Sequence, residues 1–416
     1  MIPIIKPLLD EKEIEAVAET LRSGWITQGP KVKAFEDAFA AYVGSKHACA
    51  VSNCTAALQL ALQVVGVRPG DVVLTVSHSF IATANSVRAL GAEPLFVDID
   101  LANFGISPEA LRRCIEERCE LRDGELYVRD LASIALGESP LAQLSASCSA
   151  DLNRMGRVAA ILPVHQIGIP FSLEGIYDIA SKYKLPVVED AACAVGSEIF
   201  NAEDERWERV GNGARGIACF SFHPRKLLTT GDGGMLTTSS EDFDRQFRLL
   251  RHHGMSVSDR DRHQSKTFVS EKYLCTGYNM RMTDIQAAVG IEQLKKLDEN
   301  IAERRRLAER YNEQLKEISW IETLELPESL RSNWQSYPIL IKKESGITQS
   351  QVLKVLLEKE ISSRPGIMNA HQEAPYADQE CILPNSELAC ASSVLLPLYQ
   401  GMSEADMNQI IAALKS

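Results

Sequence analysis

The sequence predicts an α/β protein built on a mostly parallel sheet of seven strands. Seven short apolar segments alternate with stretches of helical periodicity, and this alternation is typical of a parallel sheet covered by helices on both faces. The expected strands are ACAVSN (48–53), GDVVLTV (70–76), PLFVDID (94–100), AAILPV (159–164), LPVVED (185–190), ACFSF (218–222) and GGMLTT (233–238). Because ligands bind outside the carboxyl ends of such strands, functional residues are expected just after them.

Helices are expected before and between these strands. Asp10 and Glu13 form a capping-box pattern, and Gly24 ends the helix that follows. The apolar residues of this first helix fall on one face at helical spacing: Ile14, Val17 and Leu21. Further helices are expected at 31–43, 55–65, 82–90 and 283–315.

The chain is predicted to form two domains. Residues 1–250 would make a large domain, and residues 251–416 a smaller α+β domain. The boundary lies where the stretch 249–272 becomes polar and basic. Residues 119–156 fit the strand–helix alternation poorly and are interpreted as a surface insertion, either a disordered loop or a small subdomain.

Composition excludes several classes of protein. The 416 residues contain 44 Lys+Arg and 56 Asp+Glu, a formal net charge of −12 without a basic block, so nucleic acid is not an expected partner. No apolar run approaches the roughly 20 residues that span a bilayer. The N-terminus lacks the pattern of a signal peptide, and ten scattered cysteines without CxxC pairs indicate reduced thiols. We therefore expect a cytoplasmic enzyme that acts on small molecules, without a metal site.

Two strand ends carry residues suited to catalysis. LPVVED ends in Glu189 and Asp190, and a buried carboxylate there needs a partner. Asp190 could cap the next helix, or it could pair with a protonated heterocyclic nitrogen. Lys226 follows the strand that ends at Ser221 and Phe222, and it is either a solvated surface charge or an amine that forms a Schiff base.

Three further segments follow the same logic. The helix that begins after Asn53 offers free N–H groups near Thr55, which would bind phosphate or simply be capped. Phe80 follows another strand and would either stack on a flat ring or belong to the core. Asn279 and Arg281 lie in a polar loop before a helix. Neither a GxGxxG nor a P-loop motif is present, which argues against dinucleotide-binding oxidoreductases.

Taken together, these motifs resemble the DegT/StrS-type sugar aminotransferases, a branch of the fold-type I enzymes that use pyridoxal phosphate (PLP). The resemblance covers nearly the whole chain apart from the insertion. The motifs occur in the family's order, namely GWITQGPKVKAFEDAFAAYVG, SNCTAAL, SHSFIATAN, GAEPLFVDID, PVHQIG, VVEDAACAVGS, SFHPRK with TTGDGGM, LRHHG and GYNMRMTDIQAAVG.

The resemblance implies roles for individual residues. Lys226 is similar to the lysine that bonds to the cofactor and then moves the proton during transfer; family members that dehydrate sugars carry His there. Asp190 matches the acid that pairs with the pyridinium nitrogen, and Phe80 matches the aromatic that stacks on the ring. The residues that match phosphate contacts are Thr55, Ala56, Ser221 and Asn279. Asn279 matches a residue supplied by the neighbouring subunit, so the resemblance implies a homodimer with shared active sites.

This chain departs from the family pattern at three positions. Cys193 stands where the family usually has Gln beside the cofactor, Cys54 stands where it has Gly, and Ile167 replaces an aromatic residue. These differences indicate an unusual substrate rather than lost chemistry.

Substrate contacts are expected from two loops. Trp25, Thr27 and Gln28 lie in the loop that usually lines the substrate side. His371 matches a histidine that approaches the nucleotide portion, although it could equally be an exposed loop residue.

The sequence thus predicts a PLP-dependent aminotransferase. An amino acid, glutamate in the favoured interpretation, would donate its amino group to a keto group of a nucleotide-linked deoxysugar. The open alternatives are a cyclitol or an unlinked keto-sugar as acceptor, and a non-catalytic sensor or assembly protein on the same fold.

Overall fold

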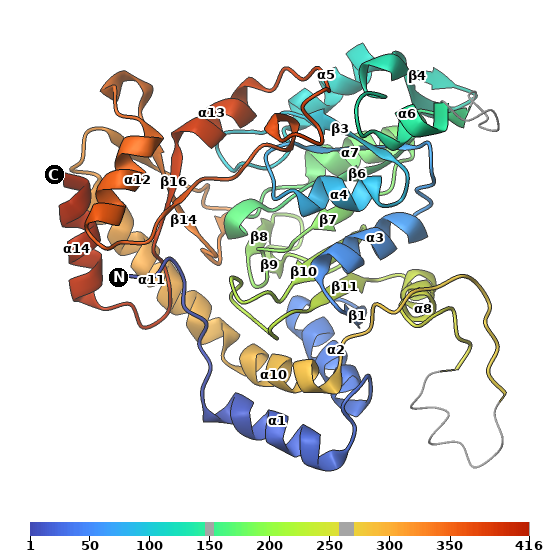
Figure 1. Ribbon diagram of the computed structural model, residues 1–416, viewed down its shortest axis with the longest axis horizontal. Helices are drawn as coiled ribbons and strands as arrows, with labels where there is room; N and C mark the ends of the chain where they lie inside the picture. The colour runs from blue at the N-terminus through green and yellow to red at the C-terminus, as the bar shows by residue number, and fades with distance from the viewer. Residues whose placement is uncertain (146–153, 258–269, 416) are drawn as a thin grey trace.

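The computed structural model describes residues 1–145, 154–257 and 270–415 (Figure 1). Parts of the predicted insertion and of the basic stretch at 249–272 therefore lie outside the described residues. The helices are α1 Glu11–Ser23, α2 Pro30–Val43, α3 Cys54–Val64, α4 Ala82–Arg88, α5 Pro108–Arg118, α6 Pro140–Ser145, α7 Glu174–Tyr183, α8 Glu241–Leu250, α10 Asp284–Lys295, α11 Leu297–Leu315, α12 Gln349–Glu358, α13 Pro384–Ser392 and α14 Glu404–Lys415.

The strands of the larger part follow the predicted order. They are β1 His47–Val51, β2 Val72–Val76, β3 Glu93–Val97, β6 Val158–Leu162, β7 Val188–Asp190, β10 Ile217–Ser221 and β11 Gly234–Thr238. They form one sheet in the order β1-β11-β10-β7 and another in the order β3-β2-β6. Two isolated parallel bridges, Ile161 to Val187 and Val164 to Asp190, join the two sheets. β11 runs antiparallel to both of its neighbours, whereas β2, β3, β6, β7 and β10 pair in parallel.

Helices cover both faces of the sheet that contains β10. Alternate residues of a strand point to opposite faces, so Phe220 packs with Phe39 of α2, while Cys219 joins Leu58 of α3. The core on the first face also receives residues of α10, and the core on the second face receives residues of α8. This burial on both faces explains why the strand segments are continuously apolar.

The first helix is predicted correctly, but its apolar face is not buried. Asp10 and Glu13 form the capping box, and Gly24 ends α1 with φ 78°. Ile14 and Leu21 are 60% and 54% exposed, because α1 packs on α10 with its other side. There Glu13 accepts a 2.7 Å hydrogen bond from Gln293 Nε2.

A second core lies in the C-terminal part of the chain. The strands β12 Ile321–Thr323, β14 Tyr337–Ile341, β16 Ser393–Leu396 and β15 Arg364–Pro365 form its sheet. Helices α11, α12 and α14 pack on this sheet. The core consists of apolar residues from the range 307–414 together with Ile2. Figure 1 shows these orange to red elements grouped at one side, with both chain ends. The division at residue 250 stays a prediction, since α10 packs on α1 and α2.

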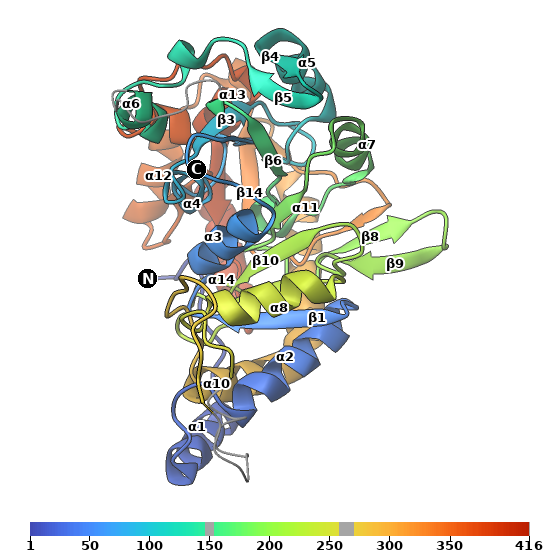
Figure 2. The ribbon, with the colours of Figure 1, turned by 90° about the vertical axis from the view of Figure 1, so that its right-hand side faces the viewer.

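The predicted insertion has regular structure where it is described. It contains the hairpin β4 Cys119–Arg122 and β5 Glu125–Val128, a short 3₁₀ helix at Leu131–Ser133, and α6. Both views place this segment at the end of the molecule opposite α1 (Figures 1 and 2). A separate hairpin, β8 Glu198–Asn201 and β9 Arg206–Arg209, projects from the side in Figure 2 and pairs with β13 Leu330–Arg331. Within the described residues, no helix combines the length and the apolarity that a membrane span requires.

Candidate active site

The two acids at the end of β7 form hydrogen bonds with different sets of residues. Glu189 Oε1 accepts a 2.9 Å hydrogen bond from Tyr177 Oη, and its other oxygen lies 3.1 Å from His165 Nε2. Asp190 points to the opposite side, where Thr83 Oγ1 of α4 donates to its Oδ2 at 2.7 Å. Alternation along the strand separates the two carboxylates, and it leaves Asp190 at the predicted site.

Asp190 is a buried carboxylate without a basic side chain within hydrogen-bond distance in the described residues. Its Oδ1 accepts from the Ala192 N–H at 3.1 Å. Burial raises the pKa of Asp190, and the hydrogen bonds from Thr83 and Ala192 only partly oppose that rise. A cationic partner at this position would therefore be strongly favoured.

Lys226 reaches the turn that follows Asp190. It lies in the loop between β10 and β11, where its backbone N–H donates to His223 O at 2.8 Å. Its Nζ donates to Cys193 Sγ at 2.9 Å. Burial alone would lower the pKa of Lys226, but the attraction of Cys193 and Asp190 exceeds that effect and raises it. Lys226 is therefore not the solvated surface charge that the sequence alone allowed.

Phe80 is exposed rather than part of the core. The residue is 70% exposed, and the chain turns directly afterwards into α4. The Thr83 N–H donates to Phe80 O at 3.1 Å, and the hydroxyl of the same threonine holds Asp190. One residue thereby connects the exposed ring to the buried acid, as stacking on a ring bound to Asp190 would require.

The start of α3 lies beside the end of β10. Ser221 pairs with Gly234 of β11, and a Cβ at Gly234 would come within 2.7 Å of Cys54 N. Only glycine permits this approach. Asn53 caps α3 by accepting from the Ala56 N–H at 2.9 Å, so the cap predicted as an alternative is present.

Thr55 and Ser221 remain available as donors at this helix start. No hydrogen bond engages the Thr55 N–H in the described part of the chain, whereas the Ala56 N–H is taken by the Asn53 cap. The Ser221 hydroxyl accepts a 3.4 Å bond from the His223 N–H, which leaves its own proton free to donate. A helix start and a hydroxyl placed in this way suit a phosphate.

Residues 333–335 bind the backbone of the turn that contains Cys193 and the backbone of the loop that contains Lys226. The sequence did not reveal this segment as part of the site. Asn333 Nδ2 donates 2.8 Å hydrogen bonds to Cys193 O and Val195 O. Gln335 Nε2 donates to Arg225 O at 2.9 Å. Trp334 between them has φ 49°, a conformation rare for a bulky residue. These contacts join residues far apart in sequence, so no local pattern signals them.

Other predicted residues lie away from Lys226. Asn279 is exposed and accepts a 3.1 Å bond from Arg281 Nε. The loop with Trp25 and Thr27 is held by α10, because Asp284 N donates to Thr27 O at 2.9 Å and its carboxylate accepts from the Gly29 N–H at 2.8 Å. Gln28 lines a cavity of about 820 Å³ between α2 and α8. In the described residues, neither Thr27, Gln28 nor Asn279 forms a hydrogen bond with Lys226.

His371 lies in a short 3₁₀ helix, Ala370–Gln372, and its side chain is only 8% exposed, so it is not an exposed loop histidine. Its Nδ1 lies 2.6 Å from Ser77 Oγ, and its Nε2 lies 3.5 Å from Glu387 Oε1. Burial lowers the pKa of His371. The neighbouring His78 lies 2.9 Å from Asn369 Oδ1 through its Nδ1, and burial lowers its pKa to about 4. Both contacts attach the segment that contains His371 to the loop preceding Phe80.

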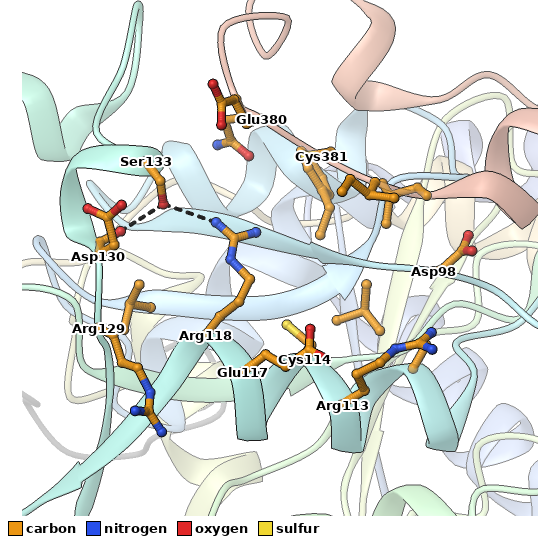
Figure 3. A pocket seen from close by; sticks show the side chains of 17 residues that line it. Asp98, Arg113, Cys114, Glu117, Arg118, Arg129, Asp130, Ser133, Glu380 and Cys381 are labelled. Atoms are coloured by element: carbon orange, nitrogen blue, oxygen red, sulfur yellow. Dashed lines mark hydrogen bonds between the residues drawn. The ribbon is translucent and has the colours of Figure 1, made fainter.

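A separate cavity of about 690 Å³ lies between α5, the insertion and residues 379–383 (Figure 3). Arg118 crosses it and donates to Ser133 Oγ at 3.1 Å, near Cys114 and Cys381. None of the predicted site residues lines this cavity. It contains both acidic and basic side chains and has no contact with the Lys226 site in the described residues.

The residues around Lys226 fit pyridoxal phosphate, the cofactor that the sequence resemblance implies. Asp190 needs a cationic partner to offset its burial, and a protonated ring nitrogen provides one. Phe80 offers an exposed ring face, Thr55 and Ser221 offer phosphate donors, and Lys226 offers the amine.

Comparisons with known proteins agree with this geometry. The family model described as the DegT/DnrJ/EryC1/StrS aminotransferase family matches residues 7–123 and 148–415, and the interruption falls inside the predicted insertion. The spore coat polysaccharide biosynthesis protein SpsC of Bacillus subtilis is 32% identical over 420 residues, which span 100% of this chain and 96% of that protein.

Solved structures show the same fold. The aminotransferase TlmJ from Streptoalloteichus hindustanus superposes with a TM-score of 0.81 at 27% identity, covering 100% of this chain and 98% of that one. A DegT DnrJ EryC1 StrS aminotransferase from Brucella abortus superposes with a TM-score of 0.78 at 28% identity, covering 97% of this chain and 95% of that one.

Proposed function

Because the chain belongs to the DegT/DnrJ/EryC1/StrS aminotransferase family and is a PLP-dependent transaminase, we propose that it aminates a keto group of a nucleotide-linked deoxysugar. Glutamate is the proposed amino donor. The observation that carries the proposal is the approach of Lys226 to the turn that follows the buried Asp190. A binding module would need neither the partly buried amine nor the buried acid that lacks a basic partner within hydrogen-bond distance in the described residues.

The cofactor and the protein side chains would contribute different parts of the reaction. When bound, PLP supplies an electron sink for the carbon that gains or loses the amino group. Asp190 would keep the ring nitrogen protonated, and Thr83 fixes the carboxylate through a hydrogen bond. Lys226 Nζ would take up and return the proton that moves during transfer, since it is the amine of this site. Phe80 would cover the ring and help to exclude water from it.

The phosphate would be held by the start of α3 and by Ser221. The positive end of the helix dipole and the Thr55 N–H favour an anion there. This local arrangement explains how a chain of net charge −12 can hold a phosphorylated cofactor.

The proposed acceptor is a sugar because of the kind of relative that the chain resembles. The name of SpsC refers to spore coat polysaccharide biosynthesis, and the match spans 100% of this chain and 96% of that protein. In our proposal a nucleotide carries the sugar, and Trp25, Thr27 and His371 contact it. The alternative acceptors are a cyclitol and an unlinked keto-sugar.

We also propose that the enzyme is a cytoplasmic homodimer with shared active sites. Asn279 is exposed and follows Tyr273 and Leu274, which are 64% and 63% exposed. Apolar side chains of α1 are exposed as well. A second copy that covers these surfaces would bring Asn279 to the partner's phosphate site. The described cysteines are all free, as expected in a reducing compartment.

The acceptor is tested by loading the protein with PLP and glutamate and offering three classes of ketone. These are nucleotide-linked keto-deoxysugars, the corresponding free sugars, and keto-cyclitols. We expect 2-oxoglutarate and an amino sugar, detected by mass spectrometry, only with the nucleotide-linked class. Faster turnover of a free sugar or a cyclitol would select that alternative, and no turnover with any class would favour the sensor.

Shared sites are tested by mixing two impaired variants, Lys226→Ala and Asn279→Ala. Random exchange of subunits leaves about a quarter of all sites with both residues intact, so a comparable share of wild-type activity should return. If hybrid dimers form and activity does not return, Asn279 does not act across the interface.

A further inference from the structure

The Lys226 amine has a single hydrogen-bond partner in the described part of the chain, and that partner is a sulfur atom. Nζ donates to Cys193 Sγ at 2.9 Å. Asp190 is close enough to attract the ammonium group, but its oxygens are bonded to Thr83 and to the Ala192 N–H. In the described residues the carboxylate forms no hydrogen bond with the amine, whereas the sulfur of Cys193 does.

Both partners of this contact are fixed through their backbones. Asn333 binds the Cys193 carbonyl, and Gln335 binds the carbonyl of Arg225, the residue before the lysine. Neither loop can shift without breaking a partly buried hydrogen bond, which contributes about 0.5–1.5 kcal/mol. Residues 333–335 thus help to set the distance between Cys193 and Lys226.

The transfer reaction needs a place for the free amine. Lys226 is bonded to the cofactor in one half of the cycle and released in the other, when the cofactor carries the amino group. A released ammonium group in a buried site is costly unless it has a partner. In the structure the Lys226 amine donates to Cys193 Sγ, so Cys193 is a partner that the chain itself provides.

We propose that the Cys193 thiol holds the Lys226 amine whenever that lysine is not bonded to the cofactor, which makes Cys193 a positioning residue for the transfer. The proposal rests on the role proposed above for Lys226. A thiol is a weak hydrogen-bonding group, so it releases the amine more readily than a carboxylate would. Asp190 stays free to pair with the ring nitrogen.

Chemical labelling of the cofactor-free protein tests the contact without any turnover. Amine acetylation follows the neutral fraction of each lysine, and peptide mass spectrometry reports Lys226 separately. The titratable groups that act on Lys226 are Cys193, Asp190 and Cys54. Since Cys193 favours the charged amine, we expect Cys193→Ala to lower the pH midpoint of Lys226 labelling by about one unit.

Matched controls separate this effect from unfolding. Cys193→Ser keeps the size of the side chain and a hydrogen-bonding atom, and it should give a midpoint between those of the wild type and Cys193→Ala. The same change at the exposed Cys275 should leave Lys226 unaffected, and the exposed Lys316 should label identically in every variant. Equal Lys226 midpoints in the wild type and in both Cys193 variants would overturn the proposal.

The loaded enzyme provides a second readout. With glutamate as donor, Cys193→Ser should shift the pH profile of kcat while the KM for glutamate stays within about twofold, because the contact concerns the amine and not donor binding. A changed KM with an unchanged pH profile would contradict the positioning role. Failure of the role of Lys226 itself is seen separately, as turnover that persists in Lys226→Ala.

Discussion

Thr83 Oγ1 donates a 2.7 Å hydrogen bond to Asp190 Oδ2, and this contact joins the helix that follows Phe80 to the end of β7. The residue that would cover the cofactor ring and the acid that would bind its nitrogen are therefore positioned through one hydroxyl group. Any loss of this contact should affect the cofactor before it affects the fold, since α4 is also held by its own packing.

Replacing Thr83 with Val keeps its shape and removes both hydrogen bonds of its hydroxyl, the one to Asp190 and the 2.8 Å one to Ser79 Oγ. We expect PLP affinity to fall about tenfold or more, because hydrogen bonds to charged groups contribute roughly 1.5–3 kcal/mol. Titration of the cofactor-free protein with PLP measures the change. Ser86→Ala is the control, since Ser86 lies in the same helix and its hydroxyl donates to Ala82 O within that helix. Unchanged affinity in Thr83→Val would show that Asp190 does not need this support.

Removing the amine or the acid should stop the reaction while the protein stays folded. We expect Lys226→Ala to lose at least about 100-fold in turnover, as is usual when the acid–base group is deleted. Asp190→Asn should lose a similar factor, because an amide cannot stabilise a protonated ring nitrogen in the same way. Turnover of the donor and thermal unfolding are measured together. Full activity in either variant would refute the role of that residue.

The buried His78 predicts a loss of stability in acid. Its pKa is lowered to about 4, whereas an unfolded histidine titrates near 6.5. The unfolded chain therefore binds a proton first as the pH falls, and the native state loses up to about 3 kcal/mol between these two values. Unfolding free energies across this range should fall less in His78→Asn, which keeps a donor toward Asn369. Parallel curves for the two proteins would rule out this contribution.

The contacts of Asn333 should contribute to the stability of the whole site. Asn333→Ala removes the side-chain donor from the partly buried carbonyl of Cys193 and from the buried carbonyl of Val195, at an expected cost of about 1–3 kcal/mol. Chemical denaturation measures the free energy of unfolding. Asn201→Ala is the comparison, because Asn201 bonds to exposed or partly exposed acids, and we expect a change below about 0.5 kcal/mol. Equal effects of the two substitutions would mean that Asn333 does not anchor this turn.

The sequence was informative where local chemistry determines the structure. The strands are continuously apolar because both faces are covered, and Lys226 and Asp190 were found because they follow strand ends. The Asp10 cap and the insertion were also visible as local patterns.

Long-range contacts and exposed faces were not visible in this way. Asn333 reaches Cys193 across 140 residues of sequence, so nothing near either residue signals the contact. The apolar face of α1 indicated burial, but the chain packs the opposite face of that helix on α10. The sequence alone was equally consistent with an exposed His371, because its partners Ser77 and Glu387 come from separate segments of the chain.

The absorbance of the PLP-loaded protein tests transamination through Lys226 most directly. We expect a visible band from the cofactor bound through Lys226, and we expect glutamate to replace it with the near-ultraviolet band of the amine form. A keto acceptor should then restore the visible band, and Lys226→Ala should show neither change. A wild-type protein that, after soaking in PLP, shows no visible band, or whose band no amino acid alters, would contradict the assignment.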